Sequence, residues 1–144
     1  MELKISRLGI LFCLITGLIS IPAKAQEEIR FDQITSLNGL SHNTVFTITQ
    51  DNQGFMWFGT VEGLNRFDGK NILTYYSNER DSFGLVSNHI FSLLPYKDCG
   101  LFVGTEQGLS FFDKLSGRFH EIDFPGGSLK RINKVYQASD GSIY

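Results

Sequence analysis

The chain of 144 residues has the length of about one domain, and its 42% hydrophobic, 19% charged and 13% aromatic residues indicate a globular protein. A formal net charge of -2 leaves no basic surface typical of nucleic-acid binding, so we expect no nucleic-acid contacts from this segment. Two cysteines are too few for a disulfide framework or a four-cysteine zinc site.

The N-terminus has the three-part pattern of a secretory signal peptide. Basic residues precede an apolar run over residues 8–21, and alanines stand at the -3 and -1 positions of a cut before Gln26. The apolar run is shorter than the ~20 residues that a membrane-spanning helix needs. We therefore expect residues 1–25 to be removed and the rest to be exported to the periplasm. The alternative is an uncleaved N-terminal anchor.

After cleavage before Gln26, Cys99 would be the one remaining cysteine. A single thiol in an oxidising compartment is either buried or a liability, because it can form unwanted disulfides. We expect Cys99 to be buried in a strand.

The rest of the chain repeats itself at an offset of 45 residues. Four blocks match without a gap, namely 43–48 over 88–93, 55–60 over 100–105, 62–64 over 107–109 and 67–68 over 112–113. A third copy begins near Leu129, with Asn133 standing 45 residues after Asn88. After a small deletion, residues 140–144 match 51–57. Such self-similarity indicates a repeat architecture.

Each repeat predicts four short strands. The first repeat has them at 44–50, 55–60, 64–68 and 72–77, and the second at 89–94, 101–105, 109–112 and 119–123. The nearly continuous apolar run at 55–60 is typical of an inner strand that is covered on both faces. Four strands at a period near 45 residues predict the blades of a β-propeller.

The predicted fold class is therefore all-β, a partial β-propeller preceded by a signal peptide. We expect a strand at 29–34, within an N-terminal segment (26–40) that closes the ring of the full-length protein. Two complete four-stranded blades would follow at 41–84 and 85–128, and then the truncated start of a third at 129–144. A ring of 4–8 blades needs roughly 180–360 residues, so we expect this chain to be a piece of a propeller.

The repeat has a readable signature, with GLSHNTV over residues 39–45 and QDNQGFMWFGTVEGLNRFDG over residues 50–69. It resembles the two-component regulator propeller repeat over nearly all of the mature chain. The second repeat departs from the pattern, because residues 95–99 replace the usual Asp-x-x-Gly turn and Phe102 replaces the tryptophan. We expect this blade to form nonetheless, since phenylalanine fills the aromatic position.

The resemblance implies the exported sensor part of a hybrid two-component regulator. Such proteins have two periplasmic propellers, a spacer, a transmembrane helix in the inner membrane and a cytoplasmic histidine kinase. The implied partners are the remaining blades, the kinase, an oligosaccharide or polysaccharide fragment as ligand, and a second subunit in a homodimer. The chain itself would be no enzyme and would hold no cofactor. The alternatives are a piece of a secreted carbohydrate-active propeller enzyme, a lyase or glycosidase, or a surface interaction propeller.

Residues that recur in both repeats are expected to be structural, because a ligand needs one site whereas every blade needs the same packing. They are Asn43, Asp51, Gly54, Trp57, Gly59, Thr60, Gly63, Leu64 and Asp68 in the first repeat, and Asn88, Phe102, Gly104, Thr105, Gly108, Leu109 and Asp113 in the second. The paired aspartates are expected to stabilise turns rather than to act as catalytic acids. The three histidines lack the spacing of metal ligands, so we expect no metal site.

The segments between blades are less symmetric, and function in repeat proteins is often found in such variation. The first of them offers four polar side chains that could hydrogen-bond a sugar, namely Asn78, Glu79, Arg80 and Asp81. The alternative is a solvated loop without a ligand.

Overall fold

The structure is a computed structural model that describes residues 30–78, 80–81, 83–124, 127 and 131–144. The chain divides into two units, residues 1–32 and 33–144. The expected signal peptide lies outside the described residues. Within the described part of the chain, no helix has the length and apolar character needed to cross a membrane.

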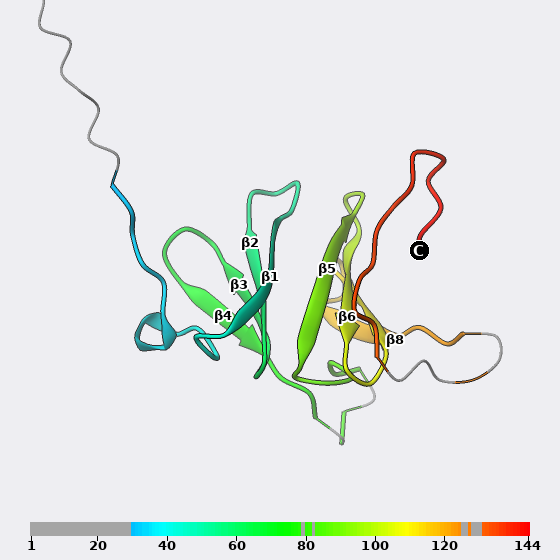
Figure 1. The fold of residues 1–144 in the computed structure, drawn as a ribbon, viewed down its shortest axis with the longest axis horizontal. Coiled ribbons are helices and arrows are strands. Elements are labelled where there is room, and N and C mark those ends of the chain that lie inside the picture. The colour runs from blue at the N-terminus through cyan, green and yellow to red at the C-terminus, as the bar shows by residue number, and fades with distance from the viewer. Residues whose placement is uncertain (1–29, 79, 82, 125–126, 128–130) are drawn as a thin grey trace, which may run out of the picture. The chain divides into compact units, whose positions relative to one another are not determined.

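The second unit contains two four-stranded antiparallel sheets, which we call blade 1 and blade 2 (Figure 1). Blade 1 consists of β1 (Val45–Gln50), β2 (Met56–Thr60), β3 (Leu64–Phe67) and β4 (Ile72–Tyr75), and blade 2 of β5 (Ile90–Tyr96), β6 (Gly100–Thr105), β7 (Leu109–Asp113) and β8 (Arg118–Glu121). In each blade the strands pair in chain order. A short 3-10 helix, η1 (Ser36–Asn38), precedes them. This all-β arrangement confirms the predicted fold class.

The two blades repeat each other in detail. In blade 1 the register of β1 against β2 shifts between Val45 and Thr47, and in blade 2 that of β5 against β6 shifts between Ile90 and Ser92. These positions are 45 residues apart, as the sequence offset predicts. The strands begin and end within about two residues of the predicted bounds, which is the usual uncertainty of element ends.

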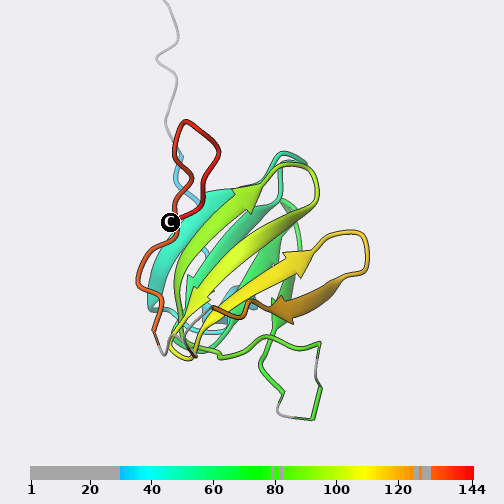
Figure 2. The ribbon, with the colours of Figure 1, turned by 90° about the vertical axis from the view of Figure 1, so that its right-hand side faces the viewer.

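The hydrophobic core lies between the blades, whose sheets pack face to face (Figures 1 and 2). Trp57 and Leu64 of blade 1 and Leu101 and Val103 of blade 2 are fully buried there. The ring centroid of Trp57 lies 5.3 Å from that of Phe112. Because a blade buries its apolar face only against a neighbour, this contact is the main stabilising element of the described structure.

Adjacent blades pack tightly at the glycine of the Gly-Thr pair. A Cβ atom on Gly59 would lie 2.5 Å from Cγ2 of Ile90, and one on Gly104 would lie 2.8 Å from Cγ2 of Ile132. Ile132 therefore occupies in the third repeat the place that Ile90 occupies in the second. It stands 42 residues after Ile90 rather than 45.

The third repeat keeps this shorter offset to its last described residue. The bridge between Gln137 and Ile143 matches the pairing of Gln50 with Met56, and in both turns the glutamine Nε2 donates to a glycine carbonyl at 3.1 Å. The expected alignment of the third copy is therefore wrong in one respect. The deletion precedes Ile132 instead of following Tyr136, because it falls in the segment between blades, where length can change without disturbing a sheet.

Two further expectations concern single segments. Cys99 is exposed, which contradicts its expected burial, because β5 continues through Tyr96 and residue 99 falls in the turn before β6. Its Sγ donates to the carbonyl of Tyr96 at 3.4 Å. Residues 30–34 form no strand. Closure of a ring by the N-terminal segment stays a prediction.

Candidate ligand-binding groove

The recurring Gly-Thr segments end in matching turns. The Thr60 hydroxyl donates to the carbonyl of Gly63 at 3.1 Å and accepts the backbone N–H of Glu62 at 3.0 Å. Thr105 donates in the same way to Gly108 at 2.8 Å. Gly63 has φ of +147° and Gly108 has φ of +154°, a conformation that side-chain-bearing residues rarely adopt. In this geometry the four residues hold the β2–β3 and β6–β7 turns.

The recurring aspartates contact their own turns. Backbone N–H groups of Asn71 and Lys70 donate to Asp68 Oδ1 at 2.6 and 2.8 Å, and these bonds lower the pKa of that carboxyl. The hydroxyl of Ser116 donates to Asp113 at 2.7 Å and lowers its pKa. A carboxyl group that acts as a general acid needs a raised pKa, so this geometry does not suit acid catalysis.

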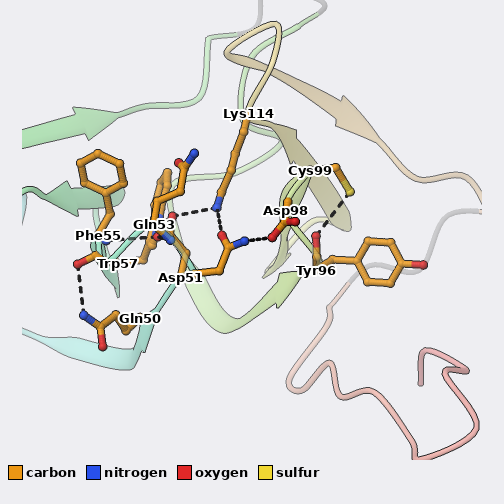
Figure 3. A network of polar contacts seen from close by, with 11 residues as sticks. Gln50, Asp51, Gln53, Phe55, Trp57, Tyr96, Asp98, Cys99 and Lys114 are labelled. Atoms are coloured by element: carbon orange, nitrogen blue, oxygen red, sulfur yellow. Dashed lines mark hydrogen bonds and ion pairs between the residues drawn. The ribbon is translucent and has the colours of Figure 1, made fainter.

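A polar network joins the blades at the ends of β1 and β5 (Figure 3). Asp51 is 5% exposed, accepts the Trp57 Nε1–H at 2.9 Å and lies 3.0 Å from the Lys114 Nζ of blade 2. Lys114 also donates to Asn52, which donates to Asp98. Burial alone would raise the pKa of Asp51, but the bonds from Trp57 and Lys114 outweigh it and hold that pKa below its ordinary value.

A groove of about 650 Å³ lies at the opposite end of strand β2, where blade 1 leads into blade 2. Its walls come from the residue after β2, the β4–β5 segment, the β6–β7 turn and the last residue of β8. The polar side chains that line it include Asn78, Asp81, Asn88, His89, Glu106 and Glu121. Its volume falls within the roughly 300–1,000 Å³ that is typical of small-molecule sites.

Two of the four predicted ligand residues line this groove. They are Asn78 and Asp81, and each also accepts a backbone N–H of its own loop, from Arg80 at 3.1 Å and from Phe83 at 3.0 Å. Arg80 is not among the lining residues. Glu79 lies outside the described residues.

His89 has the most distinctive environment in the groove. Its ring stacks on Phe91 at 4.6 Å and on Phe46 at 5.4 Å between centroids. Its Nδ1 lies 3.4 Å from Glu106 Oε2. Its Nε2 is buried and, among the described residues, has no hydrogen-bond partner. Such an unsatisfied buried polar atom costs about 1–3 kcal/mol.

The sequence analysis did not assign these blade 2 residues to a groove, although one signal was present. Blade 1 has Thr44, Val61 and Tyr76 where blade 2 has His89, Glu106 and Glu121. The repeat therefore loses its symmetry at these three positions of the groove, and each change places an imidazole or a carboxylate there. Which of these positions meet in space depends on how the strands of blade 2 pack, and the sequence pattern does not give that.

The recurring turns and the closely packed sheets define a piece of a β-propeller built from blades of one type. Residues 39–62 match the family model described as the two component regulator propeller, which confirms the resemblance predicted from the repeat. Among the described residues, no three His, Cys, Asp or Glu side chains are placed to hold a metal ion.

The known proteins that this chain resembles include a histidine kinase and hybrid two component systems. Histidine kinase P4 of Formosa agariphila is 37% identical over 76 residues, which are 52% of this chain and 6% of that protein. The extracellular domain of the hybrid two component system BT3049 from B. thetaiotaomicron is 28% identical with a TM-score of 0.68, over 76% of this chain and 16% of that structure. The extracellular domain of BT4673 from the same organism has a TM-score of 0.55 at 22% identity, over 74% of this chain and 14% of that structure, and shows the fold alone. The chain thus spans a small part of each relative.

Proposed function

We propose that this chain is the N-terminal part of the extracytoplasmic ligand-sensing propeller of a hybrid two-component regulator. The observation that carries the proposal is the match to the extracellular domain of such a system, with a TM-score of 0.68 over 76% of the chain. The histidine kinase that is 37% identical over 76 residues supports a kinase as the output. In this proposal residues 1–25 direct export, the propeller lies in the periplasm, and the parent protein is anchored in the inner membrane.

The proposed mechanism is binding rather than catalysis. An oligosaccharide or polysaccharide fragment would bind the propeller and change the relative placement of two subunits in a homodimer. The kinase equilibrium can shift only by the difference between the ligand's affinities for the two states. The turn contacts of Asp68 and Asp113 support a structural role for these two aspartates.

The test uses the full-length protein that contains this chain, reconstituted in membrane vesicles. Oligosaccharides of defined composition are added, and both kinase phosphorylation and sugar chain length are measured. We expect one class of oligosaccharide to change the phosphorylation level while its chain length stays constant. Cleavage of the sugar would overturn the proposal in favour of a carbohydrate-active enzyme. Binding with an unchanged phosphorylation level would overturn it in favour of an interaction propeller.

A further inference from the structure

The charge of the groove between the blades restricts what it can bind. Asp81, Glu106 and Glu121 bring three carboxylates to its lining, and the described lining residues include no lysine or arginine. His89 is the basic group there, and Glu106 already faces it at 3.4 Å. Asp81, Glu106 and Glu121 are exposed, so an anionic ligand would meet like charges whose repulsion is screened by water and salt.

The hydrogen-bonding groups of the groove match a ligand rich in hydroxyl groups. A carboxylate accepts hydrogen bonds at two oxygens, so it can hold two neighbouring hydroxyls of one sugar ring. Glu106 and Glu121 offer this arrangement from the β6–β7 turn and the end of β8. The buried Nε2 of His89 adds a polar atom that has no partner among the described residues.

An aromatic surface adjoins these polar groups, because His89 belongs to both. The rings of Phe46, His89 and Phe91 contact one another, with centroids 4.6–5.4 Å apart. Phe46 remains 48% exposed, although it is a large apolar side chain. Aromatic faces bind the apolar C–H faces of sugar rings, whereas the adjoining carboxylates bind their hydroxyls.

The groove is also held in place by the blades themselves. Asn88 accepts the backbone N–H of Ser77 at 2.6 Å, which ties the β4–β5 segment to the start of β5. The N–H of Glu106 donates to the carbonyl of His89 at 3.1 Å, which fixes the two residues relative to each other. A site that is already ordered loses less entropy when a ligand binds.

We propose that this groove is a binding subsite for an uncharged oligosaccharide and that its carboxylates reject acidic ones. The inference rests on the proposed sensing function and adds a location and a charge class to its ligand. A polyamine would also satisfy the carboxylates, and its ammonium groups would be attracted to the aromatic faces. The polyamine is therefore an outcome of the test.

The experiment measures binding to the full-length protein by calorimetry. The probes are neutral hexasaccharides (xylo-, manno-, laminari- and malto-), acidic hexasaccharides of alginate and polygalacturonate, and spermidine. We expect one neutral hexasaccharide to bind and the acidic ones to bind at least roughly tenfold more weakly. Stronger binding of an acidic hexasaccharide, or of spermidine, would overturn the proposal.

Variants of the groove then test the location. Glu121→Ala and His89→Gln should each weaken binding of the neutral hexasaccharide by roughly tenfold to a hundredfold, as expected for lost hydrogen bonds to a charged or buried group. The double variant Glu106→Gln/Glu121→Gln should reduce the discrimination against acidic hexasaccharides. The control is Glu62→Gln, because Glu62 is exposed and is not among the lining residues. Unchanged melting temperatures establish that the variants fold.

The outcomes separate this inference from the proposed function. If a hexasaccharide changes kinase phosphorylation while the groove variants bind it as the wild type does, the groove proposal is wrong and the sensing function stands. If Glu62→Gln weakens binding as much as Glu121→Ala does, the location is wrong. If the wild-type protein binds only an acidic hexasaccharide, the groove proposal is wrong and the sensing function stands, and if it binds no hexasaccharide of either kind, both proposals fail.

Discussion

Blade 1 and blade 2 fill the same place, the turn between their first two strands, with different chemistry. Blade 1 has Asp51 at the turn, with its carboxylate bonded to the Trp57 indole at 2.9 Å and paired with Lys114 of blade 2. The guanidinium of Arg66 lies 4.6 Å from the ring centre of Phe55 and 5.9 Å from that of Trp57. The end of blade 1 is thus held by charged and polar contacts around two aromatic rings.

Blade 2 replaces all four positions together. The sequence has Tyr96, Gly100, Phe102 and Phe111 where blade 1 has Asp51, Phe55, Trp57 and Arg66. The Tyr96 and Phe111 rings lie 5.3 and 4.9 Å from that of Phe102. A Cβ atom on Gly100 would lie 2.1 Å from the Phe111 ring, so the glycine makes room for a phenylalanine that replaces an arginine.

Blade 2 lacks both the indole donor and the carboxylate acceptor that bond to each other in blade 1. Blade 2 has no carboxylate at the position of Asp51, and Phe102 has no N–H that would need one. Loss of the Asp51 carboxylate alone would leave the buried Trp57 Nε1–H without its acceptor, which costs about 1–3 kcal/mol. The departures that made blade 2 look irregular in sequence are therefore mutually compensating in the structure.

The largest expected difference between the blades comes from removing the two equivalent rings. Trp57→Ala deletes a fully buried side chain and also strips Asp51 of a donor, so we expect the free energy of unfolding to fall by about 3–5 kcal/mol. Phe102→Ala should cost less, because Phe102 has no counterpart of the hydrogen bond that Trp57 makes to Asp51. Chemical denaturation of the full-length protein's exported region measures both. Equal losses would contradict the interpretation that the two positions differ in bonding.

A second experiment introduces the hydrogen-bonded Asp–Trp pair of blade 1 at the equivalent positions of blade 2. Phe102→Trp introduces an indole N–H without its carboxylate, and Tyr96→Asp introduces a carboxylate without its donor, so each is expected to destabilise by about 1–3 kcal/mol. The double variant should recover part of this loss, with a favourable coupling of about 0.5–3 kcal/mol. A double-mutant cycle on unfolding free energies measures the coupling. Additive losses would mean that the Asp–Trp bond is not what links these positions.

The strands could be predicted from the sequence because their signals are local. The repeat offset, the β-branched and aromatic runs and the glycine turns all lie within single segments of the chain, and the strand bounds followed from them. The groove could not be predicted in this way. His89, Glu106 and Glu121 come from three separate segments, and only the packing of blade 2 brings them to one lining.

Lys114 offers a test of the contact between the blades. Its Nζ pairs with the buried Asp51, so Lys114→Met should destabilise by about 1–3 kcal/mol, with Lys70→Met in the exposed β3–β4 turn as the control. The pKa of Asp51 is below its ordinary value of 3.8 in the folded protein. The stability from this ion pair is therefore present above about pH 4 and lost as the pH falls further. Unfolding free energies should show the gap between wild type and Lys114→Met narrowing below about pH 4. A gap that is constant down to low pH would mean that the lysine acts through its methylene groups.

The smallest expected effect concerns Cys99, where the turn of blade 2 has a thiol in place of the glycine of blade 1. Cys99 is exposed and its Sγ makes one weak bond to the Tyr96 carbonyl, so Cys99→Ser should change the unfolding free energy by less than about 0.5 kcal/mol. A thiol reagent should modify Cys99 in the folded protein almost as fast as in the unfolded one. Slow modification would mean that the turn is covered, and Cys99→Gly, which restores the residue of blade 1, would then show whether the thiol itself makes that contact. A neutral Cys99→Gly would show that the turn of blade 2 does not depend on the thiol.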